Sequence, residues 1–450
     1  ARPRCPLPPL PAAAAALPPL PSPASLSPPF RLRLRASQES KVIAWGDAQY
    51  GGDIHPWTAA ELHDVADLYH TTGAFAAHRR DKSVVAWGDA RYGGDAGRVV
   101  PGVAKVYSND VAFAAVLEAG GVATWGAKGA GGAIPNDVEA KLAAQDVDII
   151  FSNEFAFAAR LADGSVEAWG YGPGGGTMPP AVVNMLSGFP VERVYASRQA
   201  FAAKTFLGSV SVWGAAEAGG DLGELDNNGD GTLNNNDLGS RTVVAVAASH
   251  YAFAATLNTG AVVAWGDDKA GGAIPPGALD ELGEVVEVVA TSAAFCARGA
   301  NGKIAAWGAP TAGGDVSEVT TFLASVNGLK VTQVVATDYA FAAVLEDGGV
   351  VAWGDAHNGG ALCADSATAC PKAQKLAGST RGGVDVVKLY ATEVSFAALL
   401  ADRTVVTWGD AKGGGDSDAI AAQLHDVKEL VAAGSAFTAI RCGENDPDCA

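Results

Sequence analysis

The densest group of side chains able to do chemistry is a twelve-residue stretch of Asp, Asn, Gly and Thr, Asp226–Asp237. A Ca²⁺ loop takes oxygen ligands at its positions 1, 3, 5, 7, 9 and 12, with a glycine at position 6 for the sharp turn. Gly231 occupies that sixth position. The stretch therefore predicts a Ca²⁺ site. The alternative is a solvated turn, since the same residue types favour turns without metal.

In that prediction each ligand has a defined role. Asp226, Asn228 and Asp230 offer side-chain oxygens, Thr232 a main-chain carbonyl, Asn234 a direct or water-mediated contact, and Asp237 the closing carboxylate. The pattern resembles EF-hand loops and, more closely, the calcium loops of dockerin modules. No flanking helix pair or second loop is evident, so we expect bound Ca²⁺ to stabilise the fold rather than to trigger a conformational change.

Two cysteine pairs with six intervening residues form the second candidate group, Cys363 with Cys370 and Cys442 with Cys449. Both lie in expected loops, and local disulfides there would indicate an oxidising compartment. The alternative is four reduced surface thiols. Neither pair has the additional Cys or His ligands of a zinc site.

Other motifs predict no catalytic or cofactor-binding residue. Gly170–Gly175 matches the spacing Gly-x-Gly-x-x-Gly, but no helix is expected to open there and hold a pyrophosphate. The seven histidines share neither a repeat position nor a metal spacing. We therefore expect the chain not to be an enzyme, and a site assembled from distant loops is the remaining enzymatic alternative.

The elements that position these residues come from a repeat. Nine Trp-Gly pairs begin at Trp45, Trp87, Trp125, Trp169, Trp213, Trp265, Trp307, Trp353 and Trp408. The 363 residues from first to last span eight intervals of about 45 residues, within the range of a propeller blade. Twelve residues before each of the last eight stands a Phe: Phe75, Phe113, Phe157, Phe201, Phe253, Phe295, Phe341 and Phe396.

Each repeat predicts a β-hairpin preceded by a third strand. In Phe341–Trp353, two apolar runs flank Asp347-Gly348, a pair that suits a tight turn. A β-branched run precedes each Phe, and a Gly-Gly pair follows each Trp-Gly. Length varies only between a Trp and the next Phe, as expected of a rigid scaffold that carries function in its loops.

The two ends of the repeat region complement each other. Trp45 has no Phe twelve residues upstream, because Arg33 stands there, and Phe437 has no Trp downstream. Pairing the strand Val42–Trp45 with the strand of Phe437 would complete a ninth sheet and close the ring without free edges. An incompletely closed ring and a seven-bladed ring with extra repeats are the alternatives.

Units such as Tyr251–Gly266, followed by Gly271–Pro276, resemble RCC1 repeats, especially those of bacterial RCC1-like propellers of the β-lactamase inhibitory protein II type. The resemblance covers residues 41–441 and implies an all-β propeller of about nine repeats. It also implies several non-enzymatic roles, namely nucleotide exchange on a small GTPase, inhibition of an enzyme, and scaffolding. It assigns no functional residue, since fold does not fix function.

Composition divides the chain and narrows its partners. Residues 1–40 hold eleven prolines and five arginines with no acid before Glu39, as in a plastid transit peptide or a Pro-rich linker. The propeller follows over 41–441, with insertions at 222–239 and 361–383 and a Cys-containing tail at 442–450. The net charge of −18 argues against nucleic acid, which is bound mainly through Lys and Arg. No apolar run is long enough to cross a bilayer.

We therefore expect a protein-interaction scaffold or an accessory subunit of a larger complex. The leader suggests a plastid location, with a photosystem antenna assembly as one host and peripheral attachment to a membrane complex. Cytoplasmic or secreted locations are the alternatives. A regulator of a small GTPase is the second functional hypothesis.

Overall fold

The computed structural model describes residues 42, 44, 47–95, 99–226, 231–234, 237–326, 328–362 and 371–441. Within them the chain forms nine small antiparallel sheets in sequence order. Six sheets have three strands, two carry a short fourth strand, and the last has two. The predicted all-β repeat propeller is confirmed.

The first strand of every sheet begins with a valine and carries a β-bulge between its first and third residues. Such a bulge increases the local twist of a sheet. These inner strands are β1 (Val65–His70), β5 (Val103–Ser108), β8 (Val147–Ser152), β11 (Val191–Ala196), β15 (Val243–Ala248), β18 (Val285–Ala290), β21 (Val331–Ala336), β24 (Val386–Ala391) and β27 (Val427–Ala433).

The predicted hairpin supplies the next two strands of each sheet. The middle strands are β2 (Ala74–Arg79), β6 (Ala112–Leu117), β9 (Ala156–Leu161), β12 (Ala200–Thr205), β16 (Ala252–Leu257), β19 (Ala294–Gly299), β22 (Ala340–Leu345), β25 (Ser395–Leu400) and β28 (Ala436–Arg441). The third strands are β3 (Val84–Gly88), β7 (Val122–Gly126), β10 (Val166–Gly170), β13 (Val210–Gly214), β17 (Val262–Gly266), β20 (Ile304–Gly308), β23 (Val350–Gly354) and β26 (Val405–Gly409). Short fourth strands are β4 (Val99–Val100) and β14 (Thr232–Leu233).

Helices occupy only the connections between sheets. The α-helices are α1 (Pro56–Glu61), α2 (Asn136–Ala144), α3 (Pro180–Leu186), α4 (Ser317–Ser325) and α5 (Pro371–Lys375). Single helical turns follow the Trp-Gly pairs at η1 (Ala48–Tyr50), η2 (Ala90–Tyr92), η3 (Lys128–Ala130), η4 (Gly172–Gly174), η5 (Ala216–Ala218), η7 (Asp268–Ala270), η8 (Pro310–Ala312), η9 (Ala356–Gly360) and η11 (Ala411–Gly415). Further turns are η6 (Gly223–Leu225), η10 (Ser379–Arg381) and η12 (Asp418–Gln423).

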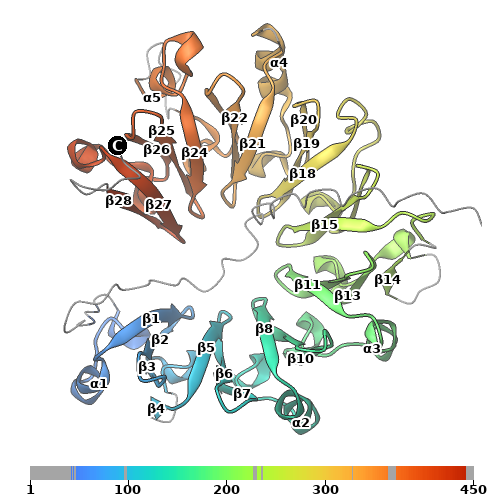
Figure 1. The fold of residues 1–450 in the computed structure, drawn as a ribbon, viewed down its shortest axis with the longest axis vertical. Coiled ribbons are helices and arrows are strands. Elements are labelled where there is room, and N and C mark those ends of the chain that lie inside the picture. The colour runs from blue at the N-terminus through green and yellow to red at the C-terminus, as the bar shows by residue number, and fades with distance from the viewer. Residues whose placement is uncertain are drawn as a thin grey trace, which may run out of the picture.

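The sheets follow one another around a central axis, with their first strands nearest that axis (Figure 1). Each inner strand contacts the inner strand of the next sheet, from β1 to β27. β1 and β27 stand at the two ends of the series, and no described strand joins them. The predicted closing strand lies largely outside the described residues, because only Val42 and Ala44 of it are described. Its pairing with β28 therefore stays a prediction.

The core lies between neighbouring sheets and is built on the recurring Phe and Trp. In the fourth sheet Phe201 pairs with Trp213 across β12 and β13, with ring centroids 5.4 Å apart. Both side chains pack with Ala156, Ala158 and others of the preceding sheet. The eight described Trp side chains of the repeat are all buried, so they serve packing.

The Gly-Gly pairs allow this packing. Gly175 has φ +98°, and a Cβ there would lie 2.7 Å from the Phe201 ring of the next sheet. A Cβ on Gly176 would lie 2.4 Å from the main chain of Gly170. The carbonyl of Gly175 also accepts a hydrogen bond from the Trp213 indole at 2.9 Å. Packing thus accounts for Gly175, the last glycine of the Gly170–Gly175 motif.

Candidate functional site

A three-residue turn joins the inner and middle strands of the first eight sheets, and its first residue anchors it. In the last sheet β27 includes the first of these positions, Ala433, which leaves Gly434 and Ser435 as the turn. The Asn109 amide donates to the carbonyl of Ala130 at 2.8 Å, and its oxygen accepts from the main-chain N–H of Ala112 at 2.7 Å. Asn, Ser or Thr occupies this position in the first eight turns. The turns are therefore fixed to the helical loops that follow the Trp-Gly pairs.

The second turn residue links each sheet to the next through the main chain. Its N–H donates to the carbonyl of its counterpart, as from Thr72 to Asp110 at 2.9 Å and from Glu393 to Gly434 at 2.9 Å. All eight bonds of this type are present. We name these nine residues the polar belt: Thr72, Asp110, Glu154, Arg198, His250, Ser292, Asp338, Glu393 and Gly434. Since the turns follow the strands nearest the axis, the belt runs around the axis at one face of the propeller.

Arg198 is the one cation of the belt. Its guanidinium pairs with the buried carboxylate of Glu154 in the neighbouring turn. It also donates to the Tyr251 hydroxyl at 3.0 Å and lies 5.7 Å from the centroid of that ring. A charge-assisted bond and a cation–π contact together hold this side chain in place.

Burial and neighbouring charges displace three belt pKa values. Burial, with the negative charge of Glu154, raises the pKa of Asp110 to about 6. Burial, with the negative charge of Glu393, raises the pKa of Asp338 to about 6. Burial, with the positive charge of Arg198, lowers the pKa of His250 to about 4. At neutral pH, Asp110 and Asp338 are therefore mainly ionised and the His250 imidazole is neutral, while Arg198 carries a positive charge.

Aromatic side chains surround the belt on the same face. Tyr251 and Tyr339 follow belt residues directly, and Tyr50, Tyr92 and Tyr171 stand in or beside the helical turns of that face. Tyr50, Tyr171 and Tyr339 are exposed. Tyrosines offer large, rigid contact areas with a polar end. We call the belt and these tyrosines the axial face.

Sequence reasoning missed the belt, although a signal for it existed. Its members stand three residues before each recurring Phe, at a position where the repeat tolerates almost any polar residue. A variable polar position inside an otherwise constant repeat marks a surface free to diverge. That these positions form one hydrogen-bonded series depends on the ring and cannot be read from a single repeat.

The structure places part of the predicted Ca²⁺ loop. Asp226, Thr232, Asn234 and Asp237 are described, whereas Asn228 and Asp230 lie outside the described residues. Asp226 accepts from the main-chain N–H of Gly231 at 2.7 Å, and Asp237 from that of Asn234 at 3.0 Å. No group of three or more His, Cys, Asp or Glu among the described residues is placed to hold a metal ion. Because two of the six ligands are missing from the description, the site stays a prediction.

The remaining predicted groups have these positions. Cys363, Cys370, Cys442 and Cys449 lie outside the described residues, as does the leader at 1–40. Cys296 is buried and unpaired, and burial raises the pKa of its thiol. No described helix is both long and apolar enough to cross a membrane.

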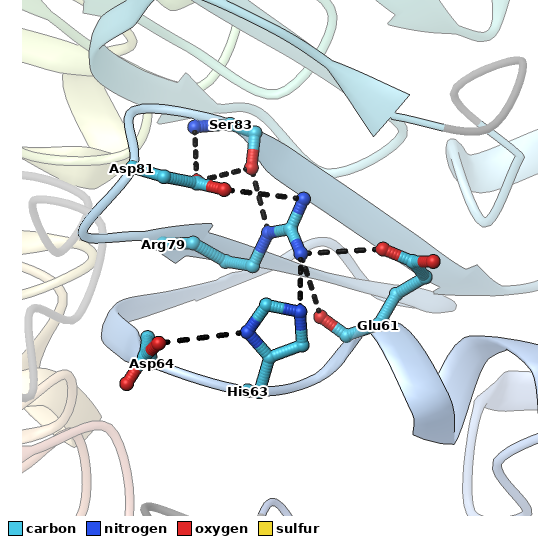
Figure 2. A network of polar contacts seen from close by, with 6 residues as sticks. All are labelled: Glu61, His63, Asp64, Arg79, Asp81 and Ser83. Carbon is cyan, nitrogen blue, oxygen red and sulfur yellow. Dashed lines mark hydrogen bonds and ion pairs between the residues drawn. The ribbon is translucent and has the colours of Figure 1, made fainter.

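A second polar cluster surrounds Arg79 in the first sheet (Figure 2). The buried guanidinium donates to the Ser83 hydroxyl at 2.6 Å, and to the main chain and carboxylate of Glu61 at 3.2 Å. It also lies 3.0 Å from His63. The contacts tie the end of α1 to the hairpin of β2 and β3, so we interpret the cluster as structural. The last sheet repeats the motif, with Arg441 against His425.

Comparison with known proteins finds distant structural similarity to other proteins. No protein-family model and no curated protein matches the chain. Among solved structures, Prp20p of Saccharomyces cerevisiae, the yeast RCC1, is 14% identical over 76% of this chain and 84% of its own, with a TM-score of 0.39. The ectodomain of the Physcomitrella patens receptor kinase CR4 is 14% identical over 62% and 69%, with a TM-score of 0.34. The C-terminal domain of gp131 from bacteriophage phiKZ is 11% identical over 77% and 90%, with a TM-score of 0.30. At these values the fold assignment rests on the sheets described above.

Proposed function

We propose that this chain is a non-enzymatic protein-interaction module that holds a protein partner against its axial face. The observation that carries the proposal is the polar belt. Eight main-chain hydrogen bonds hold its side chains in a fixed series, and exposed tyrosines surround it. Tyrosine and arginine are enriched at protein interfaces and among their binding hot spots.

The charge of the belt indicates the kind of partner surface. Its four carboxylates face one guanidinium, and the whole chain carries a net charge of −18. Electrostatic complementarity steers association and suppresses wrong partners. We therefore expect the partner to present Lys or Arg side chains toward the axis.

Photo-crosslinking from single positions tests this proposal. A photoreactive phenylalanine analogue replaces Tyr339 on the axial face. In a second protein it replaces Ala401, which lies in the hairpin of β25 and β26 at the end of that sheet opposite the axial face. In extracts of the native source we expect the first protein to trap a partner in a defined complex. Crosslinks from Ala401 alone would place binding elsewhere and overturn the proposal.

A finer version makes the chain an accessory subunit of a plastid assembly such as a photosystem antenna. Its support is the composition of residues 1–40. It predicts that the chain migrates with a membrane complex on a native gel. Migration only as a free monomer would contradict this version without touching the interaction proposal.

Regulation of a small GTPase is the second candidate, because the resemblance to RCC1 repeats implies it. The rate of nucleotide release from candidate GTPases separates the two hypotheses. A scaffold leaves that rate unchanged, whereas an exchange factor raises it.

A further inference from the structure

The hairpin turns between middle and third strands follow one chemical rule in most sheets. In five of them the second turn residue is Asp or Asn, and its side chain accepts the main-chain N–H two residues later at 2.9–3.0 Å. Such Asx turns stabilise the tight reversal of the chain. The five residues are Asp81, Asp163, Asn301, Asp347 and Asp402.

Three of the eight hairpins have another residue at this position, namely Ala119, Leu207 and Thr259. Among these three, only the hairpin of β12 and β13 carries a large apolar side chain there. Leu207 occupies the position of the Asx residue, and Phe206 precedes it. Their side chains are 65% and 66% exposed, among the most exposed large apolar residues described. Leucine cannot accept the turn hydrogen bond, and the Thr205 hydroxyl accepts the N–H of Ser209 instead, at 3.3 Å. The hairpin therefore keeps a stabilised turn but exposes two large apolar side chains to solvent. A local rule broken without a folding gain indicates a functional site.

Two more exposed apolar residues flank this hairpin. The N–H of Phe206 donates to the carbonyl of Pro190 at 3.2 Å, directly after Phe189, which is 45% exposed. The N–H of Val243 donates to the carbonyl of Gly208 at 2.8 Å, directly before Val244, which is 52% exposed. We name Phe189, Phe206, Leu207 and Val244 the Phe-Leu patch.

The patch is separate from the axial face. β12 runs from the belt turn at Arg198 to the hairpin at Phe206, and its six residues span about 20 Å. The two sites therefore lie at opposite ends of one strand. As in the first sheet, a short fourth strand lies beside the hairpin, because β14 from the insertion pairs with β13 at Val210 and Leu233.

A cation stands at the margin of the patch. Arg241 is exposed, lies two residues before Val243, and forms no ion pair with any residue the structure describes. In a chain with a net charge of −18, an exposed guanidinium beside apolar side chains favours an anionic ligand.

We infer that the Phe-Leu patch docks an acidic amphipathic segment of a partner protein. The apolar side chains of that segment cover Phe206 and Leu207, and a carboxylate pairs with Arg241. Apolar anchors beside one charged contact are the elements of a peptide-binding hot spot. This docking goes beyond the axial-face interaction and does not depend on it.

The test uses a displayed library of random twelve-residue peptides selected on the full chain, with counter-selection on the variant Phe206→Asn/Leu207→Asp. That variant introduces the Asx turn of five other hairpins, so its fold should be retained. We expect enriched peptides that combine Asp or Glu with aromatic or aliphatic residues. By fluorescence anisotropy, a synthetic copy should bind the double variant and Arg241→Glu at least tenfold more weakly than the wild-type chain.

Ala162→Asn, in the corresponding turn of β9 and β10, is the matched control and should leave the affinity unchanged. Four outcomes overturn the inference: no enrichment, enrichment of basic peptides, equal binding to both chains, or a wild-type dimer that the double variant abolishes. The last would make a second copy the occupant. None of these outcomes alters the crosslinking result that tests the axial face.

Discussion

At the scale of single residues, the Phe–Trp pair sets the stability of the molecule. Trp213 is 1% exposed, packs on Phe201 and donates to the carbonyl of Gly175. The interval of twelve residues predicted this pairing, because a two-strand hairpin of constant length brings its ends together. The indole hydrogen bond to the previous loop could not be predicted, since it joins residues 38 positions apart.

Trp213→Ala should lower the free energy of unfolding by about 3–5 kcal/mol, because it opens a cavity between two sheets. Trp57→Ala is the matched control, since that side chain is half exposed in α1 and its loss should cost less than about 1 kcal/mol. Urea denaturation of the two variants measures both. Equal losses would mean that the recurring Trp residues are not core residues.

His250 gives the belt a pH signature. Burial, with the positive charge of Arg198, lowers the pKa of His250 from an ordinary 6.5 to about 4. Between these two pH values the imidazole is protonated in the unfolded chain but neutral in the folded chain. This group therefore costs the folded state stability as the pH falls from about 6.5 toward 4. In His250→Gln the free energy of unfolding should fall less steeply across that window. An unchanged slope in His250→Gln would contradict this interpretation.

At the scale of elements, the position of η1 indicates what completes the last sheet. The carbonyl of Gly51, directly after η1, accepts the indole N–H of Trp87 at 3.1 Å, just as Gly175 accepts that of Trp213. In every such contact the loop comes from the preceding sheet. The last sheet has only two described strands, and we therefore expect the residues before η1 to complete it.

If the strand Val42–Trp45 completes the last sheet, Trp45→Ala should loosen β28. We expect faster hydrogen exchange of the Ala439 and Arg441 amides in that variant, with the amides of β12 unchanged. Unaltered exchange in β28 would contradict closure by this strand.

The insertion at 222–239 carries the metal prediction. A ligand that binds only the folded chain at 100 times its Kd stabilises it by about 2.7 kcal/mol. We therefore expect Ca²⁺ to raise the melting temperature and a chelator to lower it, with both effects lost in Asp226→Ala. A melting temperature that ignores Ca²⁺ would leave the solvated turn as the correct interpretation.

At the scale of the whole molecule, sequence periodicity predicted the architecture better than the site. Repeats of constant spacing predict identical sheets, and identical sheets pack in series around an axis. The polar belt escaped prediction because its members stand about 45 residues apart and meet only through the ring. The Phe-Leu patch could not be predicted either, because the exposure of Phe206 and Leu207 is known only from the structure.

The affinity of the crosslinked partner for chains altered on the axial face tests the account most directly. Tyr171→Ala/Tyr339→Ala removes two exposed aromatic side chains of that face and should leave the melting temperature close to that of the wild type. By isothermal titration calorimetry we expect the partner to bind this variant at least tenfold more weakly than the wild-type chain. Unchanged affinity would show that the axial face is not the binding surface.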